Sequence, residues 1–475
     1  METNILAISP LDGRYSSKVD YLSQYFSEAA LQRYRTLVEI EWFIFLFNEL
    51  ELKGTKKLKP TELRMLRAIY EQFDTVSALR VKEIEKTTNH DVKAVEYFIA
   101  EQIKETELSE FIPFLHFSCT SEDITNLSYA CMVRDFLERE LMPMFSGLVQ
   151  ELYAMAMNYK SLPMLSRTHG QPASPTTLGK EIINVVARLE NELCMLDSCE
   201  FIMGKINGAV GNYNAHSVCY PNVDWVKETE KFVSSLGIKF NKYTTQIEPH
   251  DSLAQVFDSI KRLNTIVMDL DRDIWSYISL GYFSQKVKEG EVGSSTMPHK
   301  VNPIDFENSE GNAGIANALL EHFSAKLPVS RMQRDLTDST VLRNIGSAFS
   351  YSVLAYKATL KGLSKCQVNE KVIKDDLKDK WELLAEPIQM VMRKHKIENP
   401  YEKLKALTRG KSGITKARIQ SFMKDLKIPE SDKKKLLELT PEKYIGLAEK
   451  LVEEYELKIV SEGGCSGSCS SCAGC

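Results

Sequence analysis

Apolar residues recur every three or four positions over most of the chain, which is the spacing of one helical face. The longest such stripe runs without a break over Leu253, Val256, Ile260, Leu263, Val267, Leu270 and Ile274. Two more stripes cover Ile182, Val186, Leu189, Leu193 and Leu196, and Leu141, Phe145, Leu148, Leu152 and Met155. Pro143 is expected to kink the helix that carries the last of these stripes. The pattern predicts an all-α fold whose long central helices form a bundle.

Changes in composition divide the predicted helices into domains. We expect a smaller N-terminal helical domain at residues 1–111, which ends near Pro113, and a central long-helix bundle at 112–364. A Lys- and Glu-rich helical domain follows at 365–460. Residues 461–475 form a Gly/Ser/Cys-rich tail that we expect to be disordered.

The cysteines fall into two groups. Four of them lie in the tail with the spacing C-x3-C-x2-C-x2-C, at Cys465, Cys469, Cys472 and Cys475. This spacing is compatible with a metal ion or an iron–sulfur cluster, but the tail has no histidine and no apolar residues to fold around one. The other cysteines stand in apolar or helical surroundings and are expected to be free buried thiols: Cys119, Cys131, Cys194, Cys199, Cys219 and Cys366.

Overall charge and hydropathy exclude some classes of partner. The net charge of -5 gives no indication of nucleic-acid binding. The sequence has no apolar run long enough to span a bilayer, so no membrane segment is expected. The start of the chain, Met-Glu-Thr-Asn, has no basic region followed by an apolar one. We therefore expect a cytoplasmic protein.

The densest group of reactive side chains lies at residues 293–303, Gly-Ser-Ser-Thr-Met-Pro-His-Lys-Val-Asn-Pro. Gly293 allows the backbone to bend, and Asn302 followed by Pro303 and Asp305 predicts a helix start. A segment with hydroxyl, imidazole and ammonium groups that leads into the positive end of a helix suits an anionic substrate.

Five other polar clusters lie at predicted helix starts. They are Asp12-Gly13-Arg14-Tyr15, Thr88-Asn89-His90-Asp91, Thr120-Ser121-Glu122-Asp123, Ser166-Arg167-Thr168-His169-Gly170-Gln171 before Ser174-Pro175, and Gln246, Glu248, His250 and Asp251. Helix capping alone would explain the hydroxyl and carboxylate residues, and Thr120 with Asp123 has capping-box spacing. Capping requires neither histidine nor arginine, however, so the combination favours a functional site.

A sixth cluster contains three arginines, in the group Arg331, Arg334, Asp335, Asp338, Ser339, Thr340 and Arg343. Arginines beside a serine at a helix start are typical of a phosphate-binding pocket. The alternative is a salt-bridged face exposed to solvent.

The length of one predicted helix indicates that the site is shared between subunits. A helix from about residue 122 to 159 would be roughly 57 Å long at 1.5 Å per residue. If the next helix runs antiparallel to it, the Thr120 and His169 clusters lie at opposite ends. One chain could not then bring the two clusters together, which predicts a homo-oligomer with composite sites.

These motifs resemble the fumarase/aspartase superfamily, whose Gly-Ser-Ser-x-Met-Pro-x-Lys-x-Asn-Pro pattern is matched in full by residues 293–303. Within it the chain is most similar to the adenylosuccinate lyase family of the bacterial purine pathway, over about residues 5–455. His299 and Gly170 carry this distinction, because fumarases and aspartases have alanine and leucine there, and argininosuccinate lyases have glutamine at the former. The tail after Glu462 has no counterpart in the family.

The resemblance implies an all-α fold of the fumarase/aspartase type, with smaller helical N- and C-terminal domains beside the bundle. It also implies a homotetramer whose active sites draw on three subunits. The expected reaction is elimination of fumarate from adenylosuccinate to give AMP, and from succinylaminoimidazole carboxamide ribotide (SAICAR) to give AICAR. No cofactor and no metal are implied. The alternatives are another lyase of the superfamily, a catalytically silent bundle protein, or an enzyme whose tail adds metal binding.

The resemblance assigns Ser294 as the base and His169 as the general acid that protonates the leaving nitrogen. A serine must act as an alkoxide for this, in a dry and cation-rich setting. The remaining family positions imply contacts with the nucleotide substrate: Arg14, Tyr15, Asn89, His90, Asp91, Thr120, Ser121, Gln246, Ser295, Lys300, Val301, Asn302, Asn308, Arg334, Ser339, Thr340 and Arg343.

Overall fold

The computed structural model describes residues 4–197, 202–286, 296–297, 299–408 and 414–458. The chain divides into two compact units. Unit 1 comprises Met1–Phe145, Glu192–Met268 and Asn308–Lys357, and unit 2 comprises Ser146–Asn191, Asp269–Glu307 and Ala358–Cys475. The division into three helical domains with boundaries at residues 111, 364 and 460 stays a prediction.

Most described residues are helical, which confirms the all-α prediction. Elements within unit 1 are α1 Ser16–Val19, η1 Asp20–Leu22, α2 Ser23–Phe26, α3 Glu28–Asn48, α4 Pro60–Glu71, α5 Thr75–Thr88, α6 Asp91–Ile103, η2 Ser109–Phe114, α7 Ser121–Phe136, the π-helical turn η3 Leu137–Leu141, α10 Asn214–Cys219, α11 Trp225–Ser235 and α14 Thr337–Leu342. Helices that pass along the chain from one unit to the other are α8 Met142–Asn158, α9 Leu178–Asp197, α12 Asp251–Ser279, α13 Ile304–Lys326 and α15 Ile345–Lys365. Unit 2 adds α16 Glu370–Leu377, η4 Trp381–Leu384, α17 Ala385–Lys394, α18 Pro400–Thr408, α19 Lys416–Lys424, α20 Glu430–Glu438, η5 Pro441–Lys443 and α21 Ala448–Glu453.

Strands are short and pair two by two in the described part of the chain. β1 Pro163–Thr168 and β2 Gln171–Thr177 form an antiparallel hairpin in unit 2, and β5 Phe283–Gln285 pairs antiparallel with β6 Cys366–Val368. In unit 1, β3 Met203–Gly204 pairs parallel with β4 Lys239–Phe240. Among the described helices none is both long and apolar enough to cross a membrane.

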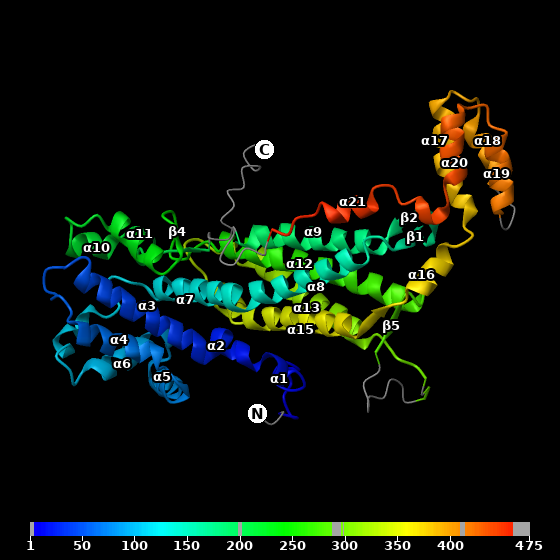
Figure 1. Ribbon diagram of the computed structural model, residues 1–475. Helices are drawn as coiled ribbons and strands as arrows, with labels where there is room; N and C mark the ends of the chain where they lie inside the picture. Colours follow the sequence, from blue (N-terminus) through cyan, green and yellow to red (C-terminus); the bar gives the residue numbers. More distant parts are fainter. Residues whose placement is uncertain (1–3, 198–201, 287–295, 298, 409–413, 459–475) are drawn as a thin grey trace. The chain divides into compact units, whose positions relative to one another are not determined.

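Aromatic rings from several helices of unit 1 contact one another, stacked in one pair and edge-on or tilted in the others. Figure 1 shows the course of these helices. The Phe136 ring of α7 lies 4.7 Å from Phe349 of α15, and Phe26 of α2 lies 5.2 and 5.3 Å from these two rings. Phe257 of α12 lies 6.0 Å from Phe349 and 5.6 Å from Phe323 of α13. Rings at these separations add pairwise attraction to the burial of their apolar area.

The predicted apolar stripes are buried. All members of the stripes on α9 and α12 are at most 4% exposed, and only Met155 of the stripe on α8 is half-buried. The break near Pro143 takes the form of the π-helical turn η3, directly before α8. Proline has no backbone N–H to donate to the preceding helical turn. The wider π turn interrupts the regular α-helical hydrogen bonds at this point, so Pro143 is accommodated as the second residue of α8.

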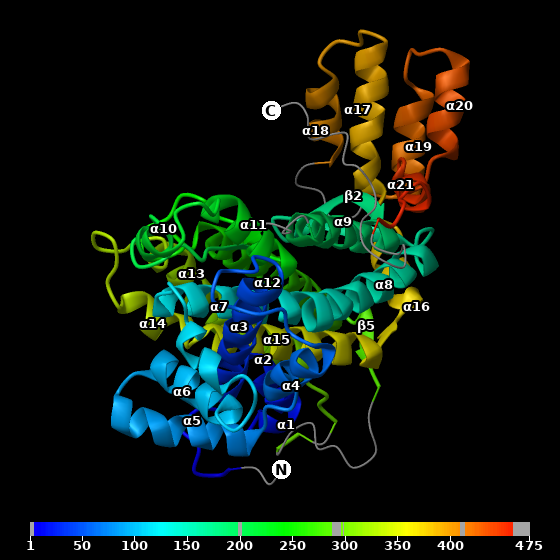
Figure 2. The ribbon, with the colours of Figure 1, turned by 90° about the vertical axis from the view of Figure 1, so that its left-hand side faces the viewer.

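In unit 2, α17, α18, α19 and α20 pack around a common apolar cluster (Figure 2). Ile388 and Met392 of α17 and Ile419 and Met423 of α19 are among its most buried members, each at most 1% exposed. The helices of this Lys- and Glu-rich region therefore bury one apolar face each against a shared small core.

Three sequence expectations are wrong in detail. Ser174 and Pro175 do not start a helix but lie in β2, and α9 begins only at Leu178. Ser339 lies inside the short helix α14 rather than at its start. Cys219 is exposed, and of the described cysteines only Cys131 is fully buried. Cys199 and the four tail cysteines lie outside the described residues.

Candidate active site

The start of α6 places His90 against the start of α7. His90 caps α6, and its Nδ1 accepts a hydrogen bond from the backbone N–H of Lys93 at 3.1 Å. With Nδ1 used as an acceptor, the proton of a neutral ring sits on Nε2, which faces Ser121 Oγ at 3.4 Å. Asn89 precedes it in the left-handed conformation, with φ of 49°. Two clusters that are 30 residues apart in sequence therefore meet.

A buried carboxylate fixes the start of α7. Asp123 accepts the backbone N–H of Thr120 at 2.7 Å, which completes the predicted capping box. It also accepts the backbone N–H groups of Asn207 and Gly208 at 2.9 and 3.1 Å. Lys205 Nζ lies 2.8 Å from the same carboxylate. Thr120 and Ser121 are thus anchored to a second segment of unit 1.

These residues border a cavity of about 400 Å³ within unit 1. It collects predicted substrate contacts from four separate stretches of sequence: His90, Asp91, Thr120, Ser121, Gln246, Arg334 and Ser339. Arg35, Glu122 and Asp335 line it too, although the sequence motifs did not single out Arg35. We therefore place the candidate active site at this cavity.

Arg334 is the cation at the centre of the lining. Its guanidinium lies 3.2 Å from Glu122 Oε2 and 3.8 Å from Asp338 Oδ1, and it donates to Gln246 Oε1 at 3.5 Å. Glu122 is 1% exposed, and burial raises its pKa to about 7 because the charged form loses its hydration.

A second group of arginines surrounds Asp91. Arg35 donates to Asp91 Oδ2 at 2.8 Å, and Arg343 reaches the same oxygen at 3.2 Å. Burial acts to raise the pKa of this carboxyl, but the two guanidinium groups outweigh it and the pKa lies below its usual value. Asp91 therefore stays ionised and orients both arginines.

Other predicted contacts of unit 1 lie near the chain start, on α13 and on α14. Asn308 Nδ2 donates to Tyr15 Oη at 3.3 Å, so these two predicted residues meet although they are 293 positions apart. Arg14 and Thr340 are exposed. Tyr15, Asn308, Arg14 and Thr340 do not line the 400 Å³ cavity.

His169 lies in unit 2, at the tip of the β1–β2 hairpin. His169 and Gly170 form the two-residue turn between the paired residues Thr168 and Gln171, with φ values of 53° and 73°. Two positive φ angles are typical of a type I′ hairpin turn, which explains a glycine beside the histidine. The imidazole is exposed and makes no hydrogen bond to any residue that the structure describes.

The segment before α13 also belongs to unit 2. Ser294 and Ser295 lie outside the described residues, while His299, Lys300 and Val301 are exposed. The Val301 carbonyl accepts a hydrogen bond from Gln285 Nε2 at 3.4 Å, and Asn302 is half-buried. Helix α13 begins at Ile304, one residue later than the Asn302-Pro303 pattern predicts.

One group of described side chains has the composition of a metal site. Glu122, His250 and Asp338 each offer a ligand atom, and these atoms lie within 4.8 Å of one another. The guanidinium of Arg334 already supplies positive charge to both carboxylates. A second, divalent charge beside it would be repelled, so the group does not fit a metal ion well.

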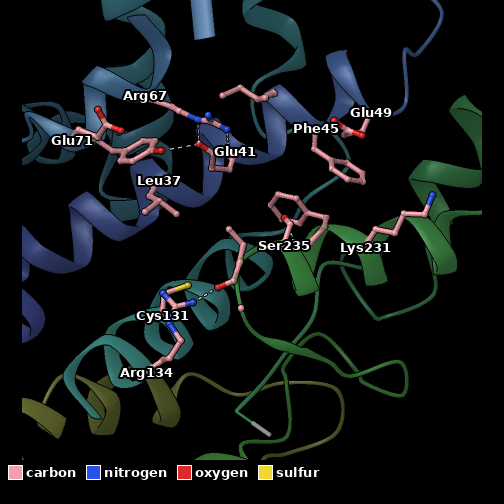
Figure 3. Close-up of a pocket in the computed structure, with 15 residues that line it drawn as sticks. Leu37, Glu41, Phe45, Glu49, Arg67, Glu71, Cys131, Arg134, Lys231 and Ser235 are labelled. Carbon is pink, nitrogen blue, oxygen red and sulfur yellow. Dashed lines mark hydrogen bonds and ion pairs between the residues drawn. The ribbon is translucent and has the colours of Figure 1, made fainter. Parts of the chain in front are cut away.

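A larger cavity of about 810 Å³ also lies in unit 1 (Figure 3). No predicted site residue lines it, and its three glutamates are matched by three cations, Arg67, Arg134 and Lys231, so the lining has no excess of positive charge for an anion. Arg67 binds Glu41 through two hydrogen bonds of 2.8 and 3.0 Å, and Tyr70 donates to Glu41 at 2.8 Å. Size alone therefore does not identify the site.

Two family models match the chain. The model described as "Lyase" matches residues 13–316, and the model described as "Adenylosuccinate lyase C-terminal" matches residues 330–445. Among curated proteins, "Adenylosuccinate lyase" of Haemophilus influenzae is 53% identical, over 95% of this chain and 99% of the relative. The protein of the same name from Escherichia coli is 52% identical over the same shares, and that of Vibrio cholerae is 51% identical over 96% and 100%.

Solved structures share the fold at much lower identity. The 3-carboxy-cis,cis-muconate lactonizing enzyme of Pseudomonas putida has a TM-score of 0.70 at 18% identity, over 91% of this chain and 95% of that chain. The beta-carboxy-cis,cis-muconate cycloisomerase of Acinetobacter calcoaceticus has a TM-score of 0.71 at 15% identity, over 93% and 98%. These two likenesses concern the fold alone.

Proposed function

Because the chain belongs to the adenylosuccinate lyase family of the fumarase/aspartase superfamily, we propose that it eliminates fumarate from adenylosuccinate to give AMP. The observation that carries this proposal is identity of about one half to proteins of that name over nearly the full length of both chains. SAICAR is the second proposed substrate, with AICAR and fumarate as its products.

The chemical difficulty is to remove a proton from the carbon beside a carboxylate. A second negative charge builds up on that carboxylate as the C–H bond breaks, so the site must supply a base and fixed positive charge. We assign Ser294 as the base, acting as an alkoxide, with Lys300 and Asn302 as partners of the succinyl carboxylates. The electron pair then forms the carbon–carbon double bond of fumarate and expels the purine nitrogen.

The leaving nitrogen needs a proton, and His169 is the proposed donor. Its place at an exposed hairpin tip leaves the imidazole free to meet a substrate. The two-residue turn supports this role because it places His169 at the tip of the hairpin, outside the paired residues of both strands.

The 400 Å³ cavity is the proposed site of the nucleotide part of the substrate. Arg334 and Ser339 are assigned to the phosphate, together with Arg343 and Thr340. His90, Thr120 and Ser121 are assigned to the groups near the reacting carbon, and Gln246 to the base or ribose. Asn89, Asp91, Ser295, Val301, Asn308, Tyr15 and Arg14 complete the proposed contacts.

The assembly proposed is a cytoplasmic homotetramer whose sites combine residues of several subunits. Membership of the family supports this assembly, and so does the distribution of the assigned residues over both compact units of the chain. No cofactor is required, because the elimination moves one proton and one electron pair without net oxidation.

The direct test is an ultraviolet assay of fumarate release with adenylosuccinate, argininosuccinate and malate in parallel. We expect turnover of adenylosuccinate alone. Ser294→Ala and His169→Asn should each lower kcat by at least about a hundredfold, the contribution typical of one acid–base group. Asparagine is chosen for His169 because it tolerates positive φ. Release of fumarate from argininosuccinate or malate instead would assign the chain to another reaction of the superfamily.

A further inference from the structure

His250 occupies a strained and fully enclosed position behind the cavity. It is 2% exposed, and its backbone is left-handed, with φ of 64°. The His250 N–H donates to Glu248 Oε2 at 2.8 Å, while its carbonyl accepts from the Ala254 N–H at 2.9 Å and begins α12. A histidine in this conformation costs free energy, and such strain persists mainly where the surroundings enforce it for a purpose.

Three carboxylates, from α7, from α14 and from the segment before α12, face the imidazole. Nε2 lies 3.8 Å from Asp338 Oδ2 of α14, Nδ1 lies 3.9 Å from Glu248 Oε2, and Glu122 of α7 completes the group. Nε2 has no hydrogen-bond partner among the described residues, and neither has Glu122 Oε1 or Asp338 Oδ2. Three buried polar atoms without partners, gathered around one ring, point to an electrostatic role rather than to packing.

Arg334 and His250 compete for the same two carboxylates. Glu122 and Asp338 each lie close to both the guanidinium and the imidazole. Neither His250 nor Asp338 lines the cavity itself. Burial lowers the pKa of His250, but Asp338, Glu122 and Glu248 outweigh it, and the pKa is raised above its usual value. A protonated imidazole offsets one carboxylate. A neutral imidazole would leave Asp338, and the ionised fraction of Glu122, to interact with the guanidinium alone.

We propose that His250 is a positioning residue whose imidazolium binds the carboxylates of Glu122 and Asp338, and so leaves the positive charge of Arg334 available to the phosphate of the substrate. The proposal rests on the function above, which assigns Arg334 to that phosphate. It adds a residue that does not contact the substrate, but that determines how far neighbouring carboxylates offset the positive charge of Arg334.

The test compares AMP with adenosine, which lacks the phosphate, by calorimetric titration of the full-length protein at pH 7. His250→Asn should raise the Kd for AMP at least about tenfold and change the Kd for adenosine by less than threefold. Asparagine keeps the positive φ and removes the charge. The double variant His250→Asn/Asp338→Asn, which loses one charge of each sign, should recover AMP affinity to within about threefold of the wild type.

Three results would overturn the inference. The Kd for AMP could stay unchanged in His250→Asn, both ligands could weaken equally, or the double variant could bind AMP no better than His250→Asn. If His250→Asn does not fold, titration of the wild type at several pH values replaces it. AMP affinity, relative to adenosine, should then fall as the pH rises above about 7, where the phosphate of AMP is already a dianion and His250 loses its proton, and a constant ratio would contradict the proposal. Glu122, Glu248, Asp338 and Arg334 are the charged groups that face the ring in this titration.

Arg334→Gln separates this inference from the function on which it rests. If Arg334→Gln weakens AMP binding and His250→Asn does not, the inference alone fails. If Arg334→Gln binds AMP and adenosine as the wild type does, the assignment of Arg334 to the phosphate fails, and the role of His250 fails with it.

Discussion

Lys205 Nζ lies 2.8 Å from Asp123 Oδ1, and both side chains are 0% exposed. The other bonds of this carboxylate go to the backbone of Thr120, Asn207 and Gly208. One buried acid therefore joins the start of α7, where Thr120 and Ser121 enter the cavity, to the segment after β3. Lys205 supplies the opposite charge that a carboxylate buried away from water needs beside it.

Replacing Lys205 by methionine should destabilise the protein strongly. The change leaves Asp123 buried without its cation, which typically costs about 3–5 kcal/mol of unfolding free energy. Denaturant unfolding followed by circular dichroism measures the effect. Lys82→Met is the matched control, because the Lys82–Glu28 pair is solvent-exposed and such pairs contribute less than about 1 kcal/mol.

The double variant Lys205→Met/Asp123→Asn separates charge from packing. We expect it to be more stable than Lys205→Met alone, since no unpaired charge is then buried. If Lys205→Met unfolds at the same denaturant concentration as Lys82→Met, the buried pair has no structural importance, and the anchoring of Thr120 must have another origin.

The stability of the protein should fall in mild acid because of His216. This ring of α10 is 1% exposed and packs edge-on against Trp225, with centroids 4.8 Å apart. Burial disfavours its charged form and lowers its pKa to about 4. Between the unfolded pKa of about 6.5 and this value the unfolded state binds more protons, so unfolding free energy is lost as the pH falls, by up to about 3 kcal/mol.

The measurement is the free energy of unfolding at pH 7.5, 6, 5 and 4.5 for the wild type and for His216→Phe. The phenyl ring keeps the aromatic contacts and cannot be protonated, so the variant should lose less stability across this range than the wild type. Equal slopes for the two proteins would show that His216 is not the group responsible.

The sequence predicted the helical stripes and the residues that start α6, α7 and α12, because both depend on local spacing and local hydrogen bonds. It did not predict the β1–β2 hairpin. Ser174-Pro175 has the signature of a helix start, but the positive φ angles of His169 and Gly170 form a two-residue turn that pairs this segment with β1. Long-range pairing decided the conformation there.

Within the site, the contacts between side chains from distant segments could not be predicted from the sequence. His250 stood out as a histidine at a helix start, yet nothing in the sequence indicated that it faces Glu122 and Asp338. Arg35 carried no signal at all, since it lies in a nearly uniformly buried helix and becomes a site residue only through its contact with Asp91. Such contacts depend on tertiary packing.

Gly179 should not tolerate a methyl group. A Cβ at this position would lie 2.3 Å from the Ala156 carbonyl oxygen and 2.6 Å from the backbone N of Lys160. Both atoms belong to the backbone near the end of α8, so they cannot move aside as a side chain can. Gly179→Ala should therefore destabilise the protein by about 1–3 kcal/mol or more.

Gly147 provides the control for this substitution. It lies inside α8, and apart from its chain neighbours and the nearby backbone of its own helix no atom comes within 4 Å of a Cβ built there. Gly147→Ala should raise the unfolding free energy by up to about 1 kcal/mol, because alanine favours the helix. Thermal unfolding of the two variants in parallel gives opposite shifts if the close approach at Gly179 is real, and shifts of the same sign if it is not.

A mixture of two inactive variants tests whether the sites are shared between subunits. If His169 and Ser294 of one site come from different chains, a subunit with Ser294→Ala can contribute its intact His169 while a subunit with His169→Asn contributes its intact Ser294. Random assembly of an equal mixture would then give about one quarter of the sites both groups. Fumarate release should rise to about that fraction of the wild-type rate after the two proteins are unfolded and refolded together, and should stay at the background of each variant when they are mixed without unfolding. Activity that remains at background after joint refolding, with tetramers of mixed composition confirmed by native mass spectrometry, would place both residues on one chain and contradict the composite site.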